Sequence, residues 1–250
     1  MQDRGPAAYL AEFLGTLMLV FFICAAVSLY GPEPSPQNPN PFIDFGVIGL
    51  VHVLVLFVLI QTLAIISGAH FNPAVTAAMT ALRQIKPVDA GIYLLAQLAG
   101  AVAAALLVKV LLTDFANAET VNLGAPAVSD ALGGKAGLGM LGEFMGGFVL
   151  VFTIVGVALD PRVDRALAPF AIGAALGLAV FITGPITGGA INPARAFGPA
   201  LVSGEFGGAG EFLLAYVLGP VLGGLLAALT YFNIFISPGK KGVEGMEPVG

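Results

Sequence analysis

Charged residues are scarce in this chain, and so are the residue types that enzymes use for catalysis. Asp, Glu, Lys and Arg together make up 10% of its 250 residues, whereas a soluble domain carries about 25%. The sequence contains no Trp, two His and a single Cys, which excludes an internal disulfide and a cysteine-based metal cluster. The CxxC, HExxH, Walker A and GxSxG motifs are also missing. We therefore expect no enzymatic activity, no cofactor and no bound metal.

Long apolar segments are what the chain has instead. Hydrophobic residues account for 58% of the sequence, and a helix needs roughly 20 such residues to cross about 30 Å of hydrocarbon. Six segments reach this length, so we predict one all-α membrane domain over residues 1–250 with six transmembrane helices. The predicted spans are about 7–30, 43–66, 88–112, 137–159, 166–184 and 211–236.

The basic residues are distributed unevenly along these spans. Seven of the ten Lys and Arg fall at the two ends of the chain, between spans 2 and 3, or between spans 4 and 5. With six spans, these four places share one side of the membrane, and the positive-inside rule makes that side cytoplasmic. The N-terminus has no basic n-region or cleavage site, so the first span is predicted to be permanent. We expect a multi-pass protein of the cell membrane with both termini in the cytoplasm.

The two halves of the chain resemble each other. AEFLGTLMLVFF (11–22) matches GEFMGGFVLVFT (142–153), which places Glu12 opposite Glu143, and YLLAQLAGA (93–101) matches YVLGPVLGG (216–224). Each half holds three spans, an odd number, so the two repeats must cross the membrane in opposite directions. Such an inverted repeat places the functional site near the membrane midplane, between the halves. The predicted repeats are about 7–112 and 137–236.

A further correspondence is the tripeptide Asn-Pro-Ala, present as Asn72-Pro73-Ala74 and again as Asn192-Pro193-Ala194. Asn at the N-cap followed by Pro at the first helical position is typical of a helix start. Each helix is predicted to run for about 11 residues, or roughly 16 Å, which is half of the membrane. A plain helix cap is the alternative for a single Asn, but the pairing favours two half-helices whose N-termini meet at one pore.

The segments before these half-helices, 67–71 and 187–191, are rich in small residues. Non-helical backbone at membrane depth is tolerated only where it lines an aqueous cavity or is buried in protein. We therefore predict re-entrant loops whose carbonyl groups form a ladder of hydrogen-bond acceptors along the pore. The predicted ladder residues are Gly68, Ala69, His70, Gly188 and Ala190.

Arg195 follows the second tripeptide in an apolar surrounding. An arginine at membrane depth costs at least about 2.5–3.5 kcal/mol on insertion scales, so it is expected to face water or protein and to be functional. The alternatives are that its long side chain reaches the membrane surface, or that it pairs with a nearby acid.

These motifs together resemble one family. The AEFxGT opening, SGAHxNPAVT and GxxINPARxxGPA are similar to the major intrinsic proteins, which comprise the aquaporins and glycerol facilitators. The resemblance implies the aquaporin fold, a homotetramer in the lipid bilayer with one pore in each subunit, and a passive channel for water. It also implies that Glu12 and Glu143 hold the backbone of the re-entrant loops. Nothing in the sequence indicates binding to nucleic acid.

Proton exclusion follows from the expected geometry. Each half-helix directs the equivalent of about half a positive charge toward the midplane. The side-chain amides of Asn72 and Asn192 can donate to the same water, which must then point its hydrogens outward. The same positive potential repels protons and other cations.

The family's spacing predicts the remaining selectivity-filter positions. Counting from the two capping Asn residues gives His52, Val180 and Gly189 beside Arg195. This set resembles certain plant tonoplast intrinsic proteins, which pass ammonia as well as water. Without a bulky aromatic residue the constriction should be wide, and His52 offers a polar group to a passing solute. A packed histidine at a helix interface is the alternative for His52.

Other transport functions stay open at this level. Glycerol facilitators usually carry Asp after the filter Arg and a basic residue further on, whereas this chain has Ala196 and Ala200, which favours water over glycerol. Two membrane carboxylates, Glu12 and Glu143, could instead indicate a proton-coupled transporter, although the repeat symmetry favours a structural role. The prediction is a channel for water and small neutral solutes, with a glycerol facilitator as the alternative.

Overall fold

The computed structural model describes residues 4–30, 42–112 and 121–237. Lys240 and Lys241, which contributed to the predicted orientation, lie outside the described residues. Over the described part the chain is helical, with no β-strand.

Six membrane-length helices form the bundle, and the prediction of six spans is confirmed. Their ends agree with the predicted ranges to within about three residues. Several spans include short turns of a tighter or wider helix, at an end or, in the sixth span, also inside it. The spans are α1 (Pro6–Tyr30), α2 (Phe42–Ser67), α4 (Pro87–Leu112), α6 (Ala136–Ile154) continued by Val155–Leu159, α7 (Ala168–Thr187) preceded by Arg165–Leu167, and a sixth comprising α9 (Ala209–Phe212), Leu213–Leu218, α10 (Gly219–Thr230) and Tyr231–Ile236.

Two short helices lie between the spans. They are α3 (Pro73–Ala81), with nine residues, and α8 (Pro193–Ser203), with eleven. Each begins at a proline and follows a stretch of non-helical backbone. At about 1.5 Å per residue neither can cross a bilayer, so both are half-helices as predicted. Two single turns, Asn122–Gly124 and Asp130–Leu132, precede α6.

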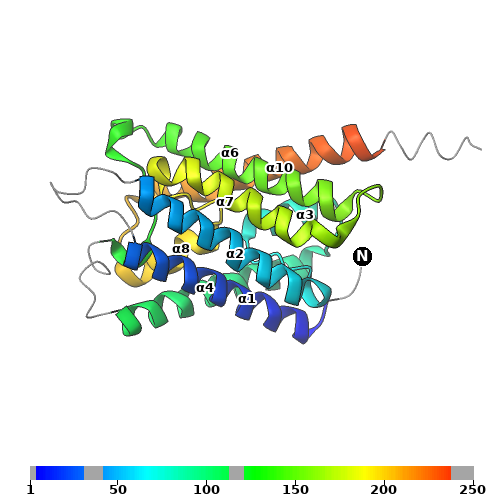
Figure 1. Cartoon of the computed structure of the whole chain (residues 1–250), viewed down its shortest axis with the longest axis horizontal. Helices are drawn as coiled ribbons and strands as arrows, with labels where there is room; N and C mark the ends of the chain where they lie inside the picture. The colour runs from blue at the N-terminus through cyan, green and yellow to red at the C-terminus, as the bar shows by residue number, and fades with distance from the viewer. Residues whose placement is uncertain (1–3, 31–41, 113–120, 238–250) are drawn as a thin grey trace, which may run out of the picture.

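The two halves of the bundle have the same internal packing. In the first half α1 contacts α2 and α4, and in the second half α6 contacts α7 and α10. The halves meet where α2 packs against α7, and each half-helix packs against the other half, α3 on α10 and α8 on α4. Figure 1 shows the start of α1 and the end of the last helix at the same end of the bundle.

Glycines allow the closest of these helix crossings. A Cβ atom added at Gly100 in α4 would overlap the carbonyl oxygen of Phe13 in α1, and one at Gly223 in α10 would overlap that of Phe144 in α6. Small residues at such crossings let the backbones approach closely, which is how helices gain packing energy in a membrane. The two crossings are equivalent in the two halves.

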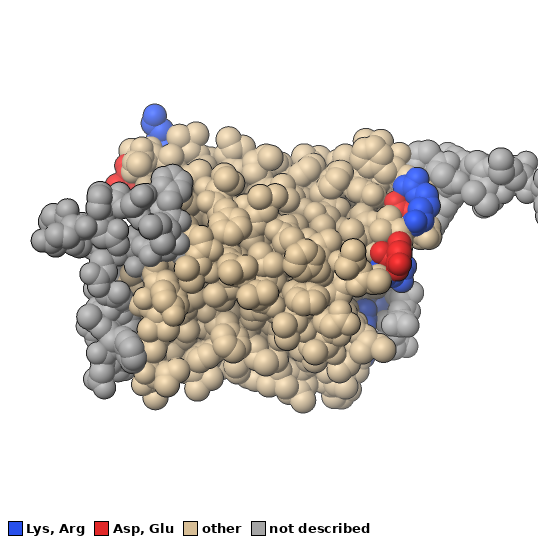
Figure 2. Space-filling model, in the orientation of Figure 1, with Lys and Arg blue, Asp and Glu red and all other residues tan. Residues whose placement is uncertain are grey.

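The lateral surface of the bundle suits a lipid environment. Figure 2 shows a wide uncharged belt, with acidic and basic residues gathered toward the two ends of the molecule. Large apolar side chains are exposed along this belt, including Ile65 at 93% and Val110 at 80%. Burial of such surface in hydrocarbon is favourable, so the belt is the lipid-facing side of a membrane protein.

Candidate functional site

The two capping asparagines begin the half-helices at the centre of the bundle. Both have extended backbone, with φ of −154° at Asn72 and −144° at Asn192. The Oδ1 atom of Asn72 accepts a hydrogen bond from the amide of Ala74 at 2.8 Å. The Oδ1 atom of Asn192 accepts from the amides of Ala194 and Arg195 at 3.0 and 3.2 Å. Each side-chain oxygen therefore caps its own helix, and the amide nitrogen is left for other partners.

These amide groups also join the two loops. The Nδ2 atom of Asn72 donates to the carbonyl of Ile191 at 3.0 Å, and that of Asn192 donates to the carbonyl of Phe71 at 2.8 Å. A side-chain amide has two N–H groups, so one on each Asn remains for the cavity beside it. From the sequence we expected both N–H groups of each amide to be available to the pore. In the structure, one N–H group of each Asn instead joins the two loops.

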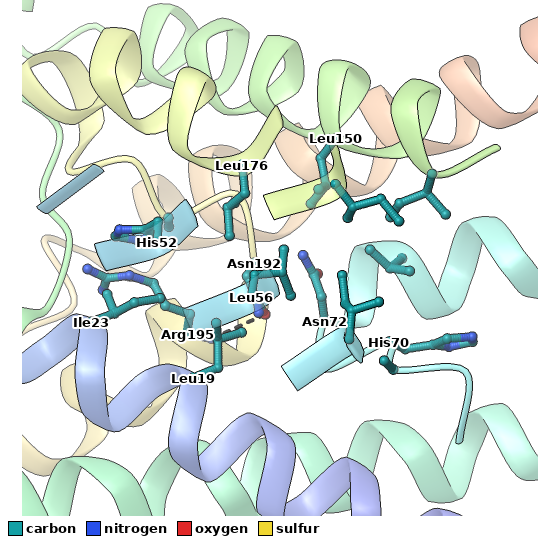
Figure 3. A pocket seen from close by; sticks show the side chains of 16 residues that line it. Leu19, Ile23, His52, Leu56, His70, Asn72, Leu150, Leu176, Asn192 and Arg195 are labelled. Carbon is teal, nitrogen blue, oxygen red and sulfur yellow. Dashed lines mark hydrogen bonds between the residues drawn. The ribbon is translucent and has the colours of Figure 1, made fainter. Parts of the chain in front are cut away.

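A narrow cavity, the central pocket, passes these asparagines. Its volume is about 20 Å³, which is room for one or two water molecules, since one water needs about 10–15 Å³. Figure 3 shows His52 and Arg195 toward one end, Asn192 and Asn72 in the middle and His70 at the other end. Apolar side chains form the facing wall, among them Leu19, Ile23, Leu56, Leu150 and Leu176.

Arg195 is buried beside the pocket. Its side chain is 1% exposed, so it does not reach the membrane surface. The Nη1 atom donates to the carbonyl of Gly124 at 2.7 Å, and the buried Nε atom has no hydrogen-bond partner. Among the described residues no carboxylate forms a salt bridge with it. The structure thus holds a cation at the pocket by a backbone carbonyl and not by a salt bridge.

His52 lies near the same end of the pocket and is 1% exposed. Its Nδ1 atom is 2.7 Å from the carbonyl oxygen of Ile48, one turn earlier in α2. A carbonyl can only accept, so Nδ1 carries the hydrogen and Nε2 of the neutral ring is an acceptor. Nε2 is buried without a partner. A lone-pair acceptor and the arginine N–H donors therefore border the same end of the pocket.

The other two predicted filter positions do not border the central pocket. Val180 is fully buried in α7, and Leu176, one turn earlier, contributes to the wall. Gly189 lies in the second loop with a left-handed backbone, φ +59°, and a Cβ there would lie 3.2 Å from the Oγ1 atom of Thr183. The structure brings His52 and Arg195 together, while Val180 and Gly189 stay predictions.

Two buried carboxylates support the re-entrant loops. Glu12 is fully buried and is turned toward the first loop. It accepts hydrogen bonds from the hydroxyl of Ser67 at 2.7 Å, the amides of His70 and Phe71 at 2.9 and 2.7 Å, and the Nε2 atom of Gln97 at 2.8 Å. These donors stabilise a buried charge that would otherwise be costly.

Glu143 does the same for the second loop. It accepts from the hydroxyl of Thr187 at 2.6 Å, from the amide of Ala190 at 2.9 Å and from the amide of Ile191. Neither carboxylate borders the central pocket, and both are occupied by loop donors. This arrangement favours a structural role over proton coupling.

The loops keep an unusual backbone because of this support. Phe71 and Ile191 have φ values of +48° and +55°, which cost free energy for residues with a β-carbon. Of the predicted ladder residues, Ala69, His70 and Ala190 border the central pocket, whereas Gly68 and Gly188, at φ +88° and +76°, do not. The loop amides point toward the carboxylates, which leaves loop carbonyls able to point toward the cavity. The carbonyl ladder itself stays a prediction.

A wider cavity, the vestibule, adjoins the central pocket at the His70 end. The vestibule has a volume of about 570 Å³. It shares six wall residues with the pocket, so the two spaces are adjacent. Its wall also includes Arg4, Arg83 and Arg165, which places these three basic residues at one end of the molecule.

Sequence reasoning missed several residues that position the site. Tyr93 and Tyr216 donate from their hydroxyls to the carbonyls of Ser67 and Thr187, at 2.7 and 2.9 Å, where each re-entrant loop leaves its helix. The matched segments 93–101 and 216–224 already placed these tyrosines opposite each other, so a signal existed. Gly124, the anchor of Arg195, gave none.

Comparisons with known proteins agree with this geometry. A family model described as "Major intrinsic protein" matches residues 5–231. "Aquaporin TIP2-1" from Arabidopsis thaliana is 37% identical over 234 residues, covering 92% of this chain and 87% of the relative. "Probable aquaporin TIP2-2" from the same plant is 36% identical over 231 residues, with the same coverage. "Aquaporin TIP2-1" from Zea mays is 37% identical over 232 residues, again covering 92% and 87%.

A solved structure shares the fold. The aquaglyceroporin from Plasmodium falciparum superposes with a TM-score of 0.74 over 93% of this chain and 97% of its own, at 22% sequence identity. At this identity the likeness concerns the arrangement of helices alone. It supports the assignment of six spans and two half-helices.

Proposed function

The chain belongs to the major intrinsic protein family, and on that premise we propose that it is a passive channel that conducts water through the central pocket. The observation that carries this function is the pair of asparagine caps beside the pocket, each of which donates from its side-chain amide to a backbone carbonyl of the opposite loop, at 3.0 and 2.8 Å. The named relatives are aquaporins. A channel for water and small neutral solutes agrees with the asparagine caps and with the names of these relatives.

The selection against protons follows from how water is held at the asparagines. Each amide keeps one N–H for the pocket, and each half-helix adds about half a positive charge there. A water oxygen that accepts from both amides directs its hydrogens away from the centre on both sides. It cannot accept a further hydrogen bond from a proton-carrying neighbour, and the positive potential also repels cations.

The His52 end of the pocket is the proposed selectivity filter. Arg195 supplies donors and charge, and the Nε2 atom of His52 supplies an acceptor. Val180 and Gly189 complete the proposed set. A small donor such as ammonia can bind the free imidazole nitrogen as well as water does, so we include ammonia among the proposed solutes.

The glycerol alternative has less support. Ala196 and Ala200 are 0% and 1% exposed, in a cluster with Phe212 and Tyr216. They present no acid or base to a polyol. The apolar wall and the small volume of the central pocket also favour a solute of the size of water.

The assembly and the membrane are also proposals. We propose a homotetramer in the cell membrane with one pore per subunit and both termini in the cytoplasm, and no enzymatic activity. The placement of Arg4, Arg83 and Arg165 around one cavity supports the orientation, because basic residues favour the cytoplasmic side. The exposed apolar belt supplies faces for neighbouring subunits as well as for lipid.

Stopped-flow light scattering of proteoliposomes tests the proposed function. Under an inward glycerol gradient, fast shrinkage reports water permeability and later fast reswelling reports glycerol entry. We expect fast shrinkage and reswelling no faster than in empty liposomes, with ammonia uptake measured next through internal pH. Fast reswelling would support the glycerol facilitator, and shrinkage at the rate of empty vesicles would contradict a water channel.

A further inference from the structure

The vestibule concentrates positive charge. Among the described residues, its wall includes Arg4, Arg83 and Arg165 and no Asp or Glu. The three arginines come from separate places: the segment before α1, the turn after α3 and the turn that begins the fifth span. Like charges around one cavity repel one another and together produce a positive potential that attracts anions.

The described carboxylates near these elements are engaged elsewhere. Asp89 accepts a hydrogen bond from a tyrosine hydroxyl at 2.6 Å, Asp160 pairs with a neighbouring arginine at 2.6 Å, and Asp164 accepts from a backbone amide at 3.0 Å. Within the described part of the chain, Arg83 and Arg165 form no ion pair. Their charges are therefore available to a ligand in the vestibule.

Arg4 has unsatisfied hydrogen-bonding capacity. One guanidinium nitrogen, Nη1, lies 3.5 Å from the carbonyl of Ile66, at the limit of a hydrogen bond, and Nε is buried without a partner. A buried N–H group without an acceptor costs free energy. An anion in the vestibule would supply acceptors to this side chain.

We propose that the vestibule binds a small multivalent anion bearing phosphoryl groups, and that its binding slows water movement through the pore. A guanidinium group matches the phosphoryl group because two parallel N–H donors meet two oxygens. A cavity of about 570 Å³ lies within the range of small-molecule sites. Because the vestibule shares six wall residues with the central pocket, an occupant would lie next to the pore.

The competing explanation is that the arginines only orient the chain in the membrane. That explanation predicts no binding. The phosphoryl group could belong to a soluble anion or to a lipid headgroup, and the vesicle experiment below distinguishes the two. The flux measurement rests on the proposed function, whereas the binding measurement does not.

Binding is measured first, by calorimetric titration of inorganic pyrophosphate into the full chain in a neutral detergent. A salt concentration of about 0.1 M limits attraction between distant charges to about 10 Å. Arg83→Gln and Arg165→Gln each remove one exposed charge from the vestibule. Lys135→Gln removes one exposed charge from the connection before α6 and serves as the matched control. We expect both arginine variants to bind at least about tenfold more weakly and the control to bind like the parent.

Flux is measured next, in vesicles of phosphatidylcholine with pyrophosphate on both sides. We expect slower shrinkage with pyrophosphate for the parent and for Lys135→Gln, and little change for the arginine variants. Vesicles that also contain phosphatidylglycerol are compared without pyrophosphate. If the parent shrinks more slowly in the vesicles with phosphatidylglycerol and the arginine variants do not, a lipid headgroup is the source of the phosphoryl group.

Several results would overturn the proposal. These are no binding of pyrophosphate and no slowing in either vesicle type, equal binding by the parent and both arginine variants, or equal weakening by Lys135→Gln. Binding with the expected arginine dependence in a protein that conducts no water would contradict the proposed function while supporting the anion site. Normal water flux without pyrophosphate binding and without slowing would support the proposed function and contradict the anion site.

Discussion

The two re-entrant loops share a plan of support. In each, a buried carboxylate, Glu12 or Glu143, accepts hydrogen bonds from two successive loop amides and from a hydroxyl. In each, a tyrosine, Tyr93 or Tyr216, donates to the carbonyl where the loop leaves its helix. The shared plan supports an unfavourable backbone in both halves.

The loops differ in what surrounds this plan. In the first half, Thr76 donates to the carbonyl of the capping Asn at 3.1 Å and accepts from Gln97 at 3.0 Å. Its only hydrogen is therefore used, so Nδ1 of His70, at 3.1 Å, must be the donor of their hydrogen bond. The matching positions in the second half are Ala196 and Pro220, which offer no side-chain hydrogen bonds.

The second half instead places Arg195 where the first half has Val75. At this position the first half therefore presents an apolar side chain to the pocket. The second half presents a cation, held by the carbonyl of Gly124 from outside the repeat. The comparison separates the loop support, which both halves share, from the buried cation, which only the second half supplies beside the pocket.

Removing either carboxylate charge tests the shared plan and should have the largest effect. Glu12→Gln or Glu143→Gln replaces one acceptor oxygen by a donor, which leaves loop N–H groups unsatisfied. At about 1–3 kcal/mol for each unsatisfied buried group, we expect roughly 2–5 kcal/mol of destabilisation in both variants, measured by thermal unfolding with circular dichroism. Glu205→Gln, at an exposed position, is the control. If one of these two variants were as stable as the parent and the other were not, the two loops would not share this plan of support.

Removing the cation tests the unshared chemistry. Arg195→Val makes the second half resemble the first at this position. It widens the pocket and removes charge, so we expect glycerol and urea to enter proteoliposomes faster, while water flux stays at least as high. A barrier lowered by about 1.4 kcal/mol corresponds to tenfold faster entry.

Two further variants serve as controls for Arg195→Val. Arg195→Lys keeps the charge on a more compact group, so it should keep cations out better than Arg195→Val does. Lys135→Gln, which lies away from the pocket, should leave solute entry unchanged. Solute entry that is the same in Arg195→Val and the parent would place the selective barrier elsewhere.

The parts of this molecule that are determined by the lipid environment could be predicted from the sequence. Hydrocarbon requires long apolar helices with every backbone group satisfied, so the six spans were visible as apolar runs. The Asn-Pro pairs marked the half-helices because the cap and the proline each suit a helix start. The position of Glu12 opposite Glu143 came from the repeat.

The contacts of the site could not be predicted in the same way. The anchor of Arg195 is a backbone carbonyl, which every residue has, so the choice of Gly124 depends on the path of a loop. The wall position in α7 depends on how the helix is rotated about its axis. Counting residues gives Val180, which stays a prediction, and Leu176, one turn earlier, borders the pocket. Neither the path nor the rotation is encoded in a local pattern.

Removing the hydroxyl of Thr76 tests the polar network of the first half. Thr76→Ala leaves the Nδ1 atom of His70 and one N–H group of Gln97 without a partner, and we expect about 1–3 kcal/mol of destabilisation with slower or less selective flux through the His70 end. Thr62→Ala is the matched control, because this exposed hydroxyl bonds only within its own helix, to the carbonyls of Val58 and Leu59. Equal stability of the two variants would mean that the network contributes nothing beyond helix packing.

The smallest effect is expected outside the membrane, at an ion pair that follows α6 in the second half. Asp160 accepts from Arg162 at 2.8 and 2.6 Å, and Arg162 also donates to the carbonyl of Phe235 at 2.9 Å. These bonds lower the pKa of Asp160 from its usual value to about 2. A lowered carboxylate pKa adds stability above the unfolded pKa of about 3.9, and this stability is lost as the pH falls toward 2.

Asp160→Asn should therefore lower the melting temperature slightly and by the same amount from pH 5 to pH 8. The difference from the parent should shrink only in acid, as the parent loses its charge. Because the arginine is exposed, water screens the pair, and the loss should be far below that of Glu143→Gln. A loss as large as that one would mean that the second half depends on its surface pair as much as on its buried carboxylate, and the shared plan would then not account for its stability.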